Sequence, residues 1–243
     1  KYENDDQSMI KQIIDNPDKV SDLDRHFCVF FQERFAAYKN FADLYSLGND
    51  TKYDLPGFYY RDMELPGNIP IRVCGINTAL VAGQWDQNTS SGSGPKNRVA
   101  GVKILADFIS RDGSNARLKL VISHYPISWV NDSERSGLAT RLSDANAIFL
   151  HGHTHDPAAD IGGIGAGHQV LIMGVGSLYG NTWLGRNHSQ ILELNPSKEK
   201  PILHERLWFS HLGWRELEPQ EIQWIGWKRK QIEGKRLLSY SCL

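Results

Sequence analysis

Two short apolar segments that each lead into histidine constrain this chain more than any other feature. One segment covers residues 118–123 and is followed by His124. The other covers residues 147–150 and leads into a Gly-His-Thr-His sequence that contains His153 and His155. Short apolar runs that end in a turn signal predict buried strands. Three imidazoles at the ends of two strands indicate one half of a metal site.

Helix-like and strand-like segments alternate along the chain. Apolar residues recur every three or four positions before residue 47 and again in 98–111, which predicts helices, and 138–142 fits a shorter helix. Further strands are predicted at 58–65, 71–76, 170–175, 190–194 and 202–209. This alternation predicts an α/β layered fold.

Charge, cysteine content and hydropathy exclude several classes of protein. The formal net charge is −1 over 243 residues, so overall charge does not direct the chain toward nucleic acid or an anionic membrane. Cys28, Cys74 and Cys242 are far apart and form no disulfide framework, which favours a reducing, cytoplasmic location. No apolar run approaches the roughly 18 residues that span a bilayer, and the first residues do not resemble a signal peptide. We therefore expect no membrane partner.

The spacing of the histidines indicates two metal ions rather than one. In an extended segment, residues i and i+2 point the same way with Cα atoms about 6.5–7 Å apart, and paired metals in hydrolases lie about 3.5–4 Å apart. His153 and His155 are therefore spaced to hold one metal each, and Gly152 before them is free to form a sharp turn. His124 leaves a neighbouring strand at the corresponding end, where open α/β sheets bind ligands.

The sequence Ser123-His124, taken with the Gly-His-Thr-His at 152–155, resembles the C-terminal half of the calcineurin-like metallophosphoesterases over roughly residues 70–194. The resemblance implies a β-sandwich flanked by helices with a dinuclear metal centre at the sheet edge. It also implies that His124 and His153 bind one metal ion and His155 the other. The expected cofactors are two divalent ions (Mn, Fe, Zn or Ni), and the expected substrate is a phosphoester attacked by metal-activated hydroxide.

Three earlier motifs of that family, which carry the bridging carboxylates, are absent from this chain. No Gly-Asp dipeptide occurs, and no Gly-Asn is followed by His. Asp24-Arg25-His26 matches Asp-x-His, but it lies in a charged, helix-like stretch, so we interpret it as no ligand pair. We expect the missing N-terminal half of the domain on the same protein or on a companion chain. Residues 1–243 alone are then expected to bind metal weakly and to hydrolyse no phosphoester.

The resemblance divides the chain into three parts. Residues 1–52 are predicted to be a helical segment of the phosphoesterase domain, residues 53–212 its C-terminal half, and residues 213–243 a Trp-rich, basic extension or linker. Two alternatives to the hydrolase stay open. One is a degenerate, non-catalytic scaffold, and the other is a nuclease or nucleic-acid-sensing module that uses Trp224, Trp227 and the basic residues 228–230.

Smaller features near the histidines are less specific. Asp156 and Asp160 are either acceptors for imidazole N–H groups or solvated loop residues. The glycine-rich segment 162–167 lacks the spacing of a dinucleotide-binding loop, so we interpret it as a mobile turn before the strand at Val170. The long segment 83–96 is predicted to be a loop.

Overall fold

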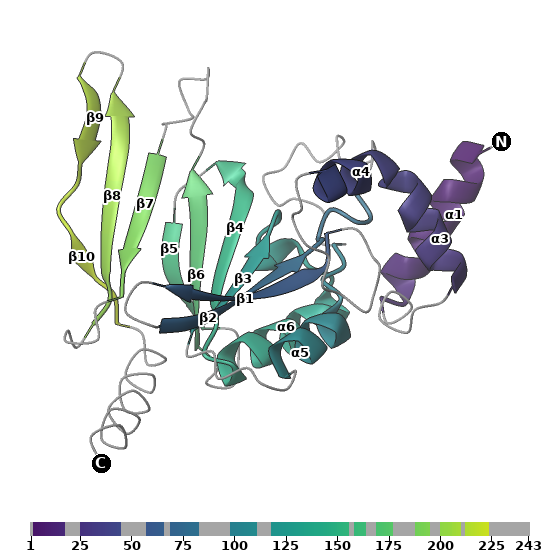
Figure 1. Cartoon of the computed structure of the whole chain (residues 1–243), viewed down its shortest axis with the longest axis horizontal. Helices are drawn as coiled ribbons and strands as arrows, with labels where there is room; N and C mark the ends of the chain where they lie inside the picture. The colour runs from purple at the N-terminus through teal and green to yellow at the C-terminus, as the bar shows by residue number, and fades with distance from the viewer. Residues whose placement is uncertain are drawn as a thin grey trace.

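A computed structural model of the chain gives a mixed α/β fold with two sheets and several helices (Figure 1). The part that it describes comprises residues 2–17, 25–44, 57–65, 69–82, 98–110, 118–155, 158–163, 169–176, 188–194, 200–209 and 212–223. The α/β class predicted from the alternation of segments is confirmed. Within these residues no helix is both long and apolar enough to cross a membrane.

In the described part of the chain, six strands form the first sheet, in the order β1-β2-β3-β4-β6-β5. Their bounds are Tyr59–Leu65 (β1), Ile69–Ile76 (β2), Leu118–Ser123 (β3), Ile148–His155 (β4), Ala158–Gly163 (β5) and Gln169–Gly176 (β6). β2, β3, β4 and β6 are parallel, and β1 and β5 are antiparallel edge strands. The carboxyl ends of the parallel strands therefore meet at one edge of the sheet, which is the edge that holds His124.

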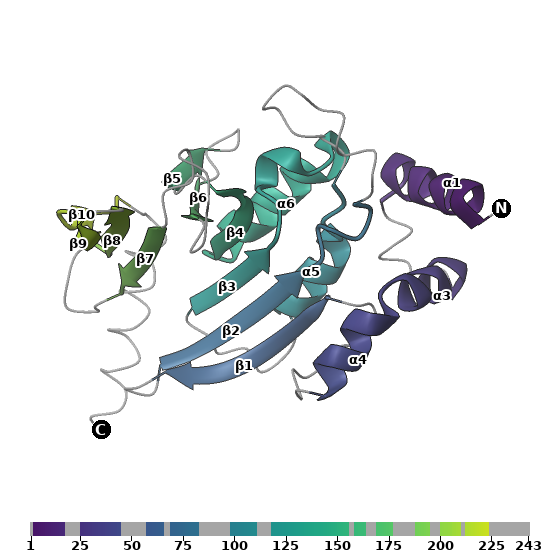
Figure 2. The ribbon, with the colours of Figure 1, turned by 90° about the horizontal axis from the view of Figure 1, so that it is seen from above.

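Helices cover one face of this sheet (Figure 2). They are α5 (Val102–Ser110) and α6 (Asp132–Asp144), preceded in the chain by α1 (Tyr2–Asp15), α3 (Arg25–Arg34) and α4 (Ala36–Leu44). In α5, Ile104, Leu105 and Phe108 are fully buried, because their three- and four-residue spacing places them on one side of the helix. They pack with Val121 and Phe149 of the sheet in the larger hydrophobic core.

A second sheet contributes to a smaller core with the other face of the first sheet. Its strands are β7 (His188–Glu193), β8 (Ile202–Phe209), β9 (Gly213–Glu216) and β10 (Gln220–Glu221). β8 pairs with all three of the others, in antiparallel fashion. Leu203 of β8 packs with Ile71, Ile148 and Leu171 of the first sheet.

Several local expectations differ from the structure. The glycine-rich turn predicted at 162–167 begins inside the sheet, since Gly162 and Gly163 end β5 and pair with β6; pairing along a neighbouring strand outweighs the weak strand preference of glycine. The helix predicted from Arg98 starts only at Val102, because Gly101 has φ +64° and Arg98 forms a bridge with Val130. In the segment 213–243, interpreted from the sequence as an extension or linker, residues 213–216 and 220–221 pair with β8 as strands of the second sheet.

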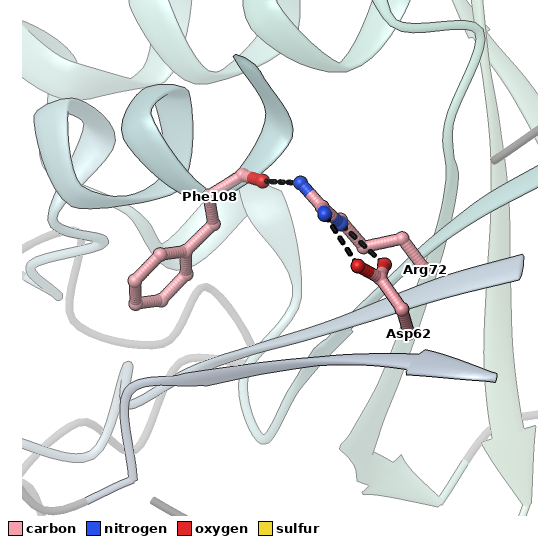
Figure 3. A network of polar contacts seen from close by, with 3 residues as sticks. All are labelled: Asp62, Arg72 and Phe108. Carbon is pink, nitrogen blue, oxygen red and sulfur yellow. Dashed lines mark hydrogen bonds and ion pairs between the residues drawn. The ribbon is translucent and has the colours of Figure 1, made fainter. Parts of the chain in front are cut away.

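A buried arginine ties the edge of the first sheet to the helical layer (Figure 3). Arg72 of β2 is 1% exposed and donates two hydrogen bonds of 2.6 Å to the carboxylate of Asp62 on β1. Its third hydrogen bond, also 2.6 Å, goes to the carbonyl oxygen of Phe108 in the last turn of α5. A cation at this position also offsets the partial negative charge of the helix C-terminus. The guanidinium lies 4.8 Å from the centroid of the Tyr60 ring.

Substitution of Arg72 by Met is expected to lower the free energy of unfolding by about 1.5–3 kcal/mol, because a buried carbonyl and a carboxylate both lose a charged donor. Arg206→Met is the matched control, since Arg206 is 53% exposed and lies 3.5 Å from Glu216. The control should change the free energy by less than about 0.5 kcal/mol. Urea unfolding at pH 7 measures the change in the free energy of unfolding for both variants. Equal changes would show that the Arg72 contacts stabilise the fold no more than an exposed ion pair does.

The same contact makes stability depend on pH. The Arg72 guanidinium holds the pKa of Asp62 below its ordinary value. A depressed carboxyl pKa contributes stability that is fully present above the unfolded pKa of about 3.9 and is lost as the pH falls through the folded pKa. The difference in unfolding free energy between the wild type and Asp62→Asn should therefore be constant above about pH 5 and should shrink below about pH 4. A constant difference down to pH 2.5 in urea titrations would contradict this account.

Candidate metal centre

Two of the three predicted ligands lie side by side. Nδ1 of His153 is 3.1 Å from Nε2 of His124, and the ring centroids are 4.9 Å apart. His124 follows β3 directly, and His153 belongs to β4, the parallel neighbour of β3. Because the carboxyl ends of parallel neighbours lie at the same edge, two histidines 29 residues apart in sequence meet there.

The two nitrogens fit a shared metal ion. A metal bound by imidazole lies about 2.0–2.1 Å from each nitrogen. With the nitrogens 3.1 Å apart, the nitrogen–metal–nitrogen angle would be roughly 95–102°. This value lies between the ~90° of octahedral and the ~109° of tetrahedral coordination. The distance between the two nitrogens therefore allows both to bind one cation.

A closed ring of buried hydrogen bonds holds the chain on both sides of His124. The backbone N–H of Tyr125 donates to Oγ1 of Thr78 at 3.1 Å, and the Ser123 hydroxyl donates to the carbonyl oxygen of Tyr125 at 2.8 Å. The Thr78 and Ser123 hydroxyl oxygens are 2.8 Å apart, so the Thr78 hydroxyl proton is left to donate to Ser123. Thr78 is 0% exposed and Ser123 is 5% exposed. The ring joins the turn after β2 to the end of β3.

The backbone of His153 is in the left-handed region, with φ +69°. This conformation costs a residue other than glycine roughly 1–2 kcal/mol, and such strain often persists at functional sites. The pairing of β4 with β6 is also irregular between His151 and His155. The expected extended geometry from His153 to His155 is therefore wrong, and the unusual backbone is at His153 rather than at Gly152. A β-carbon at Gly152 would lie 3.8 Å from the His124 carbonyl oxygen, which is an ordinary contact.

An aromatic cluster surrounds His153. Its ring lies 4.4 Å from the Tyr125 ring and 4.7 Å from the Trp129 ring, centroid to centroid. Tyr125 and Trp129 are stacked at 5.2 Å. The guanidinium of Arg98, which is fully buried, lies 4.3 Å from the centroid of the Tyr125 ring. Tyr125 and Trp129 therefore contact the His153 ring directly, and Arg98 in turn contacts Tyr125.

The preceding histidine has a different role. His151 is 8% exposed, and burial lowers the pKa of its imidazole. Its Nδ1 lies 3.0 Å from the carbonyl oxygen of Gly152, which only accepts, so Nδ1 carries the proton. His151 lies 6.1 Å from the core residue Phe149, ring to ring. We assign it to packing rather than to ligand binding.

The rest of the predicted site is only partly described. His155 continues β4 and pairs with Gly176, but its side chain is outside the described part. Asp156, the loop 83–96 and the basic residues 228–230 also lie outside it, and Asp160 is described only as a backbone position in β5. Arg25 and His26 lie in α3, as expected for a helical stretch. Among the described side chains, no group of three or more His, Cys, Asp or Glu residues is arranged to hold a metal.

Comparison with protein-family models, curated proteins and solved structures finds no match for the chain. The resemblance to the metallophosphoesterases therefore stays a prediction.

The hydrogen-bonded ring around His124 can be tested directly. Thr78→Val keeps the side-chain shape but leaves the Tyr125 N–H and the Ser123 oxygen without their partner, so the free energy of unfolding should fall by about 1–3 kcal/mol. Thr78→Ser keeps the hydroxyl and should cost less, about the 0.8 kcal/mol of one buried methyl group. Urea unfolding of both variants gives the comparison, and a Ser variant less stable than the Val variant would rule out the ring as the stabilising element.

Proposed function

We propose that this chain supplies the histidine half of a dinuclear metal centre in a phosphoester hydrolase with a metallophosphoesterase-like fold. The observation that carries the proposal is the pair of ring nitrogens, His124 Nε2 and His153 Nδ1, 3.1 Å apart at the carboxyl edge of a parallel sheet. Ligand sites in open α/β sheets occur at this edge. The second sheet and the helices on one face of the first sheet support the layered architecture that the resemblance implies.

The residues of the chain have distinct parts in the proposed centre. His124 and His153 would hold one divalent ion, and His155 the second. Bound divalent ions supply Lewis-acid polarisation of phosphoryl oxygens and a nucleophile at neutral pH. The Thr78–Ser123–Tyr125 ring orients His124, and the aromatic cluster around Tyr125 and Trp129 orients His153. The bridging carboxylates would come from the N-terminal half of the domain.

Metal binding tests this assignment without requiring activity. His124→Ala and His153→Ala should each weaken Mn²⁺ or Zn²⁺ binding to the 243-residue chain by at least tenfold, because each removes one of the two nitrogens that chelate the same ion. His204→Ala is the control, because His204 lies on the second sheet within 3.2 Å of Glu193 and far from β3 and β4 in the strand order. Calorimetric titration above pH 7, where imidazoles are neutral, measures the affinities. Equal affinities for all three variants would refute the shared site.

Hydrolysis tests the other half of the proposal. The 243-residue chain alone should not hydrolyse bis-p-nitrophenyl phosphate, because the described residues bring no carboxylate to the histidine pair. These residues combined with the carboxylate motifs, whether on the same protein or on a companion chain, should hydrolyse it in the presence of Mn²⁺, and His153→Ala should lower kcat by at least a hundredfold. Rapid hydrolysis by the 243-residue chain would contradict the division of the site into two halves.

A further inference from the structure

A pocket of about 610 Å³ lies directly beside His124. It is an open concavity lined by residues at the start of α4, at the start of β1 and at the carboxyl ends of β2 and β3, which lie next to one another in Figure 2. The residues that matter for its chemistry are Phe35, Tyr38, Tyr59, Asn77, Ile122 and His124. Pockets that bind small molecules have volumes of about 300–1,000 Å³ and mostly apolar linings. We call this site the aromatic pocket.

Aromatic rings form much of its lining, and the fold makes room for one of them. The Tyr59 ring lies against the backbone of Gly75, where any β-carbon would be 2.1 Å from Tyr59 Cε1. Burial raises the pKa of the Tyr59 hydroxyl, with a further contribution from Tyr38. Tyr38 and Ile122 line the same pocket and are 43% and 39% exposed, which is high for large apolar side chains at the rim of a concave site.

The lining carries no fixed charge. Among its described residues there is no Asp, Glu, Lys or Arg, and His124 is the one titratable group other than the tyrosines. A second pocket of similar volume has charged residues of both signs in its lining: Lys103, Asp107, Lys119, Arg141 and Asp144. Lys119 is near the amino end of β3, so that pocket is remote from the histidines. A group bound beside His124 is therefore expected to be neutral and to be held by packing and stacking rather than by charge.

We infer that the aromatic pocket binds the planar aromatic group of the substrate, such as the aryl ring or base of an aromatic phosphoester. The inference rests on the proposed function, because it places the phosphoryl group at the pair His124–His153. Phe35, Tyr38 and Tyr59 line the same pocket as His124, and stacking on aromatic residues accepts any ring with a π-face. An aliphatic group of the same size would fill the volume but would lose the stacking.

Three phosphonates that resist hydrolysis separate these possibilities: phenylphosphonate, cyclohexylphosphonate and methylphosphonate. Calorimetric titration of the 243-residue chain, with and without Mn²⁺, should show that phenylphosphonate binds at least about fivefold more tightly than either of the others. Tyr38→Ala should abolish this preference, and Tyr38→Phe should keep it. Ile122→Ala should weaken the binding of phenylphosphonate by a smaller factor than Tyr38→Ala does.

Two control variants remove exposed apolar side chains outside the pocket lining. Phe41→Ala changes an exposed ring on α4 that does not line the pocket, and Ile191→Ala changes an exposed isoleucine on the second sheet. Neither should alter the preference for the phenyl compound. Circular dichroism confirms that each variant is folded.

The outcomes for the pocket and for the metal site are distinguishable. If Mn²⁺ strengthens the binding of all three phosphonates equally but phenylphosphonate binds no more tightly than the others, the aromatic pocket is refuted and the metal site stands. If the phenyl preference persists but Mn²⁺ has no effect, the proposed function fails and the pocket stands as a binding site. Tighter binding of cyclohexylphosphonate than of phenylphosphonate would overturn the stacking inference, because burial of apolar surface alone would then explain the affinity.

Discussion

The arrangement of the candidate site depends on one buried carboxylate. Glu134, in the first turn of α6, is 7% exposed and accepts hydrogen bonds from the backbone N–H groups of Ala100 at 2.7 Å and Val102 at 3.1 Å. These donors lie at the start of α5, where helical N–H groups have no partner within the helix. A negative charge there also offsets the positive end of the helix dipole. Glu134 thus fixes the segment that leads into α5, while Arg72 holds the last turn.

That segment places Arg98 close to the carboxyl edge of the first sheet, where His124 and His153 lie. The backbone of Arg98 pairs with the chain after β3, donating to the Trp129 carbonyl at 3.0 Å and accepting from Asn131 at 2.8 Å. The Arg98 guanidinium then lies beneath Tyr125, and Tyr125 contacts the ring of His153. A buried guanidinium is costly to desolvate, and contact with an aromatic face recovers part of that cost. The position of His153 therefore depends on contacts that reach back to α6.

Much of the fold follows from local patterns, and so does the proximity of His124 and His153. The predicted strands 118–123 and 202–209 coincide with β3 and β8. Residues 118–123 are a short, mostly apolar run, whereas 202–209 has polar residues at its centre and apolar residues at both ends. His124 and His153 meet because parallel neighbours end at the same edge. The contributions of Thr78 and Arg98 were not predictable, since Thr78 reaches Ser123 across 45 residues and Arg98 lies in a segment that resembles a helix start. The strained φ of His153 was also unpredictable, because it arises from the irregular pairing of β4 with β6.

The contact between the two imidazoles has a consequence for the state of the site without a cation. A hydrogen bond between Nδ1 of His153 and Nε2 of His124 requires one nitrogen to donate and the other to accept. If both rings were protonated, neither nitrogen could accept, and two positive charges would be 3.1 Å apart. The observed geometry therefore requires at least one ring with an available lone pair. The proposed ion would need the lone pairs of both nitrogens, so it would displace the proton that they share, and its binding would compete with protonation of either ring.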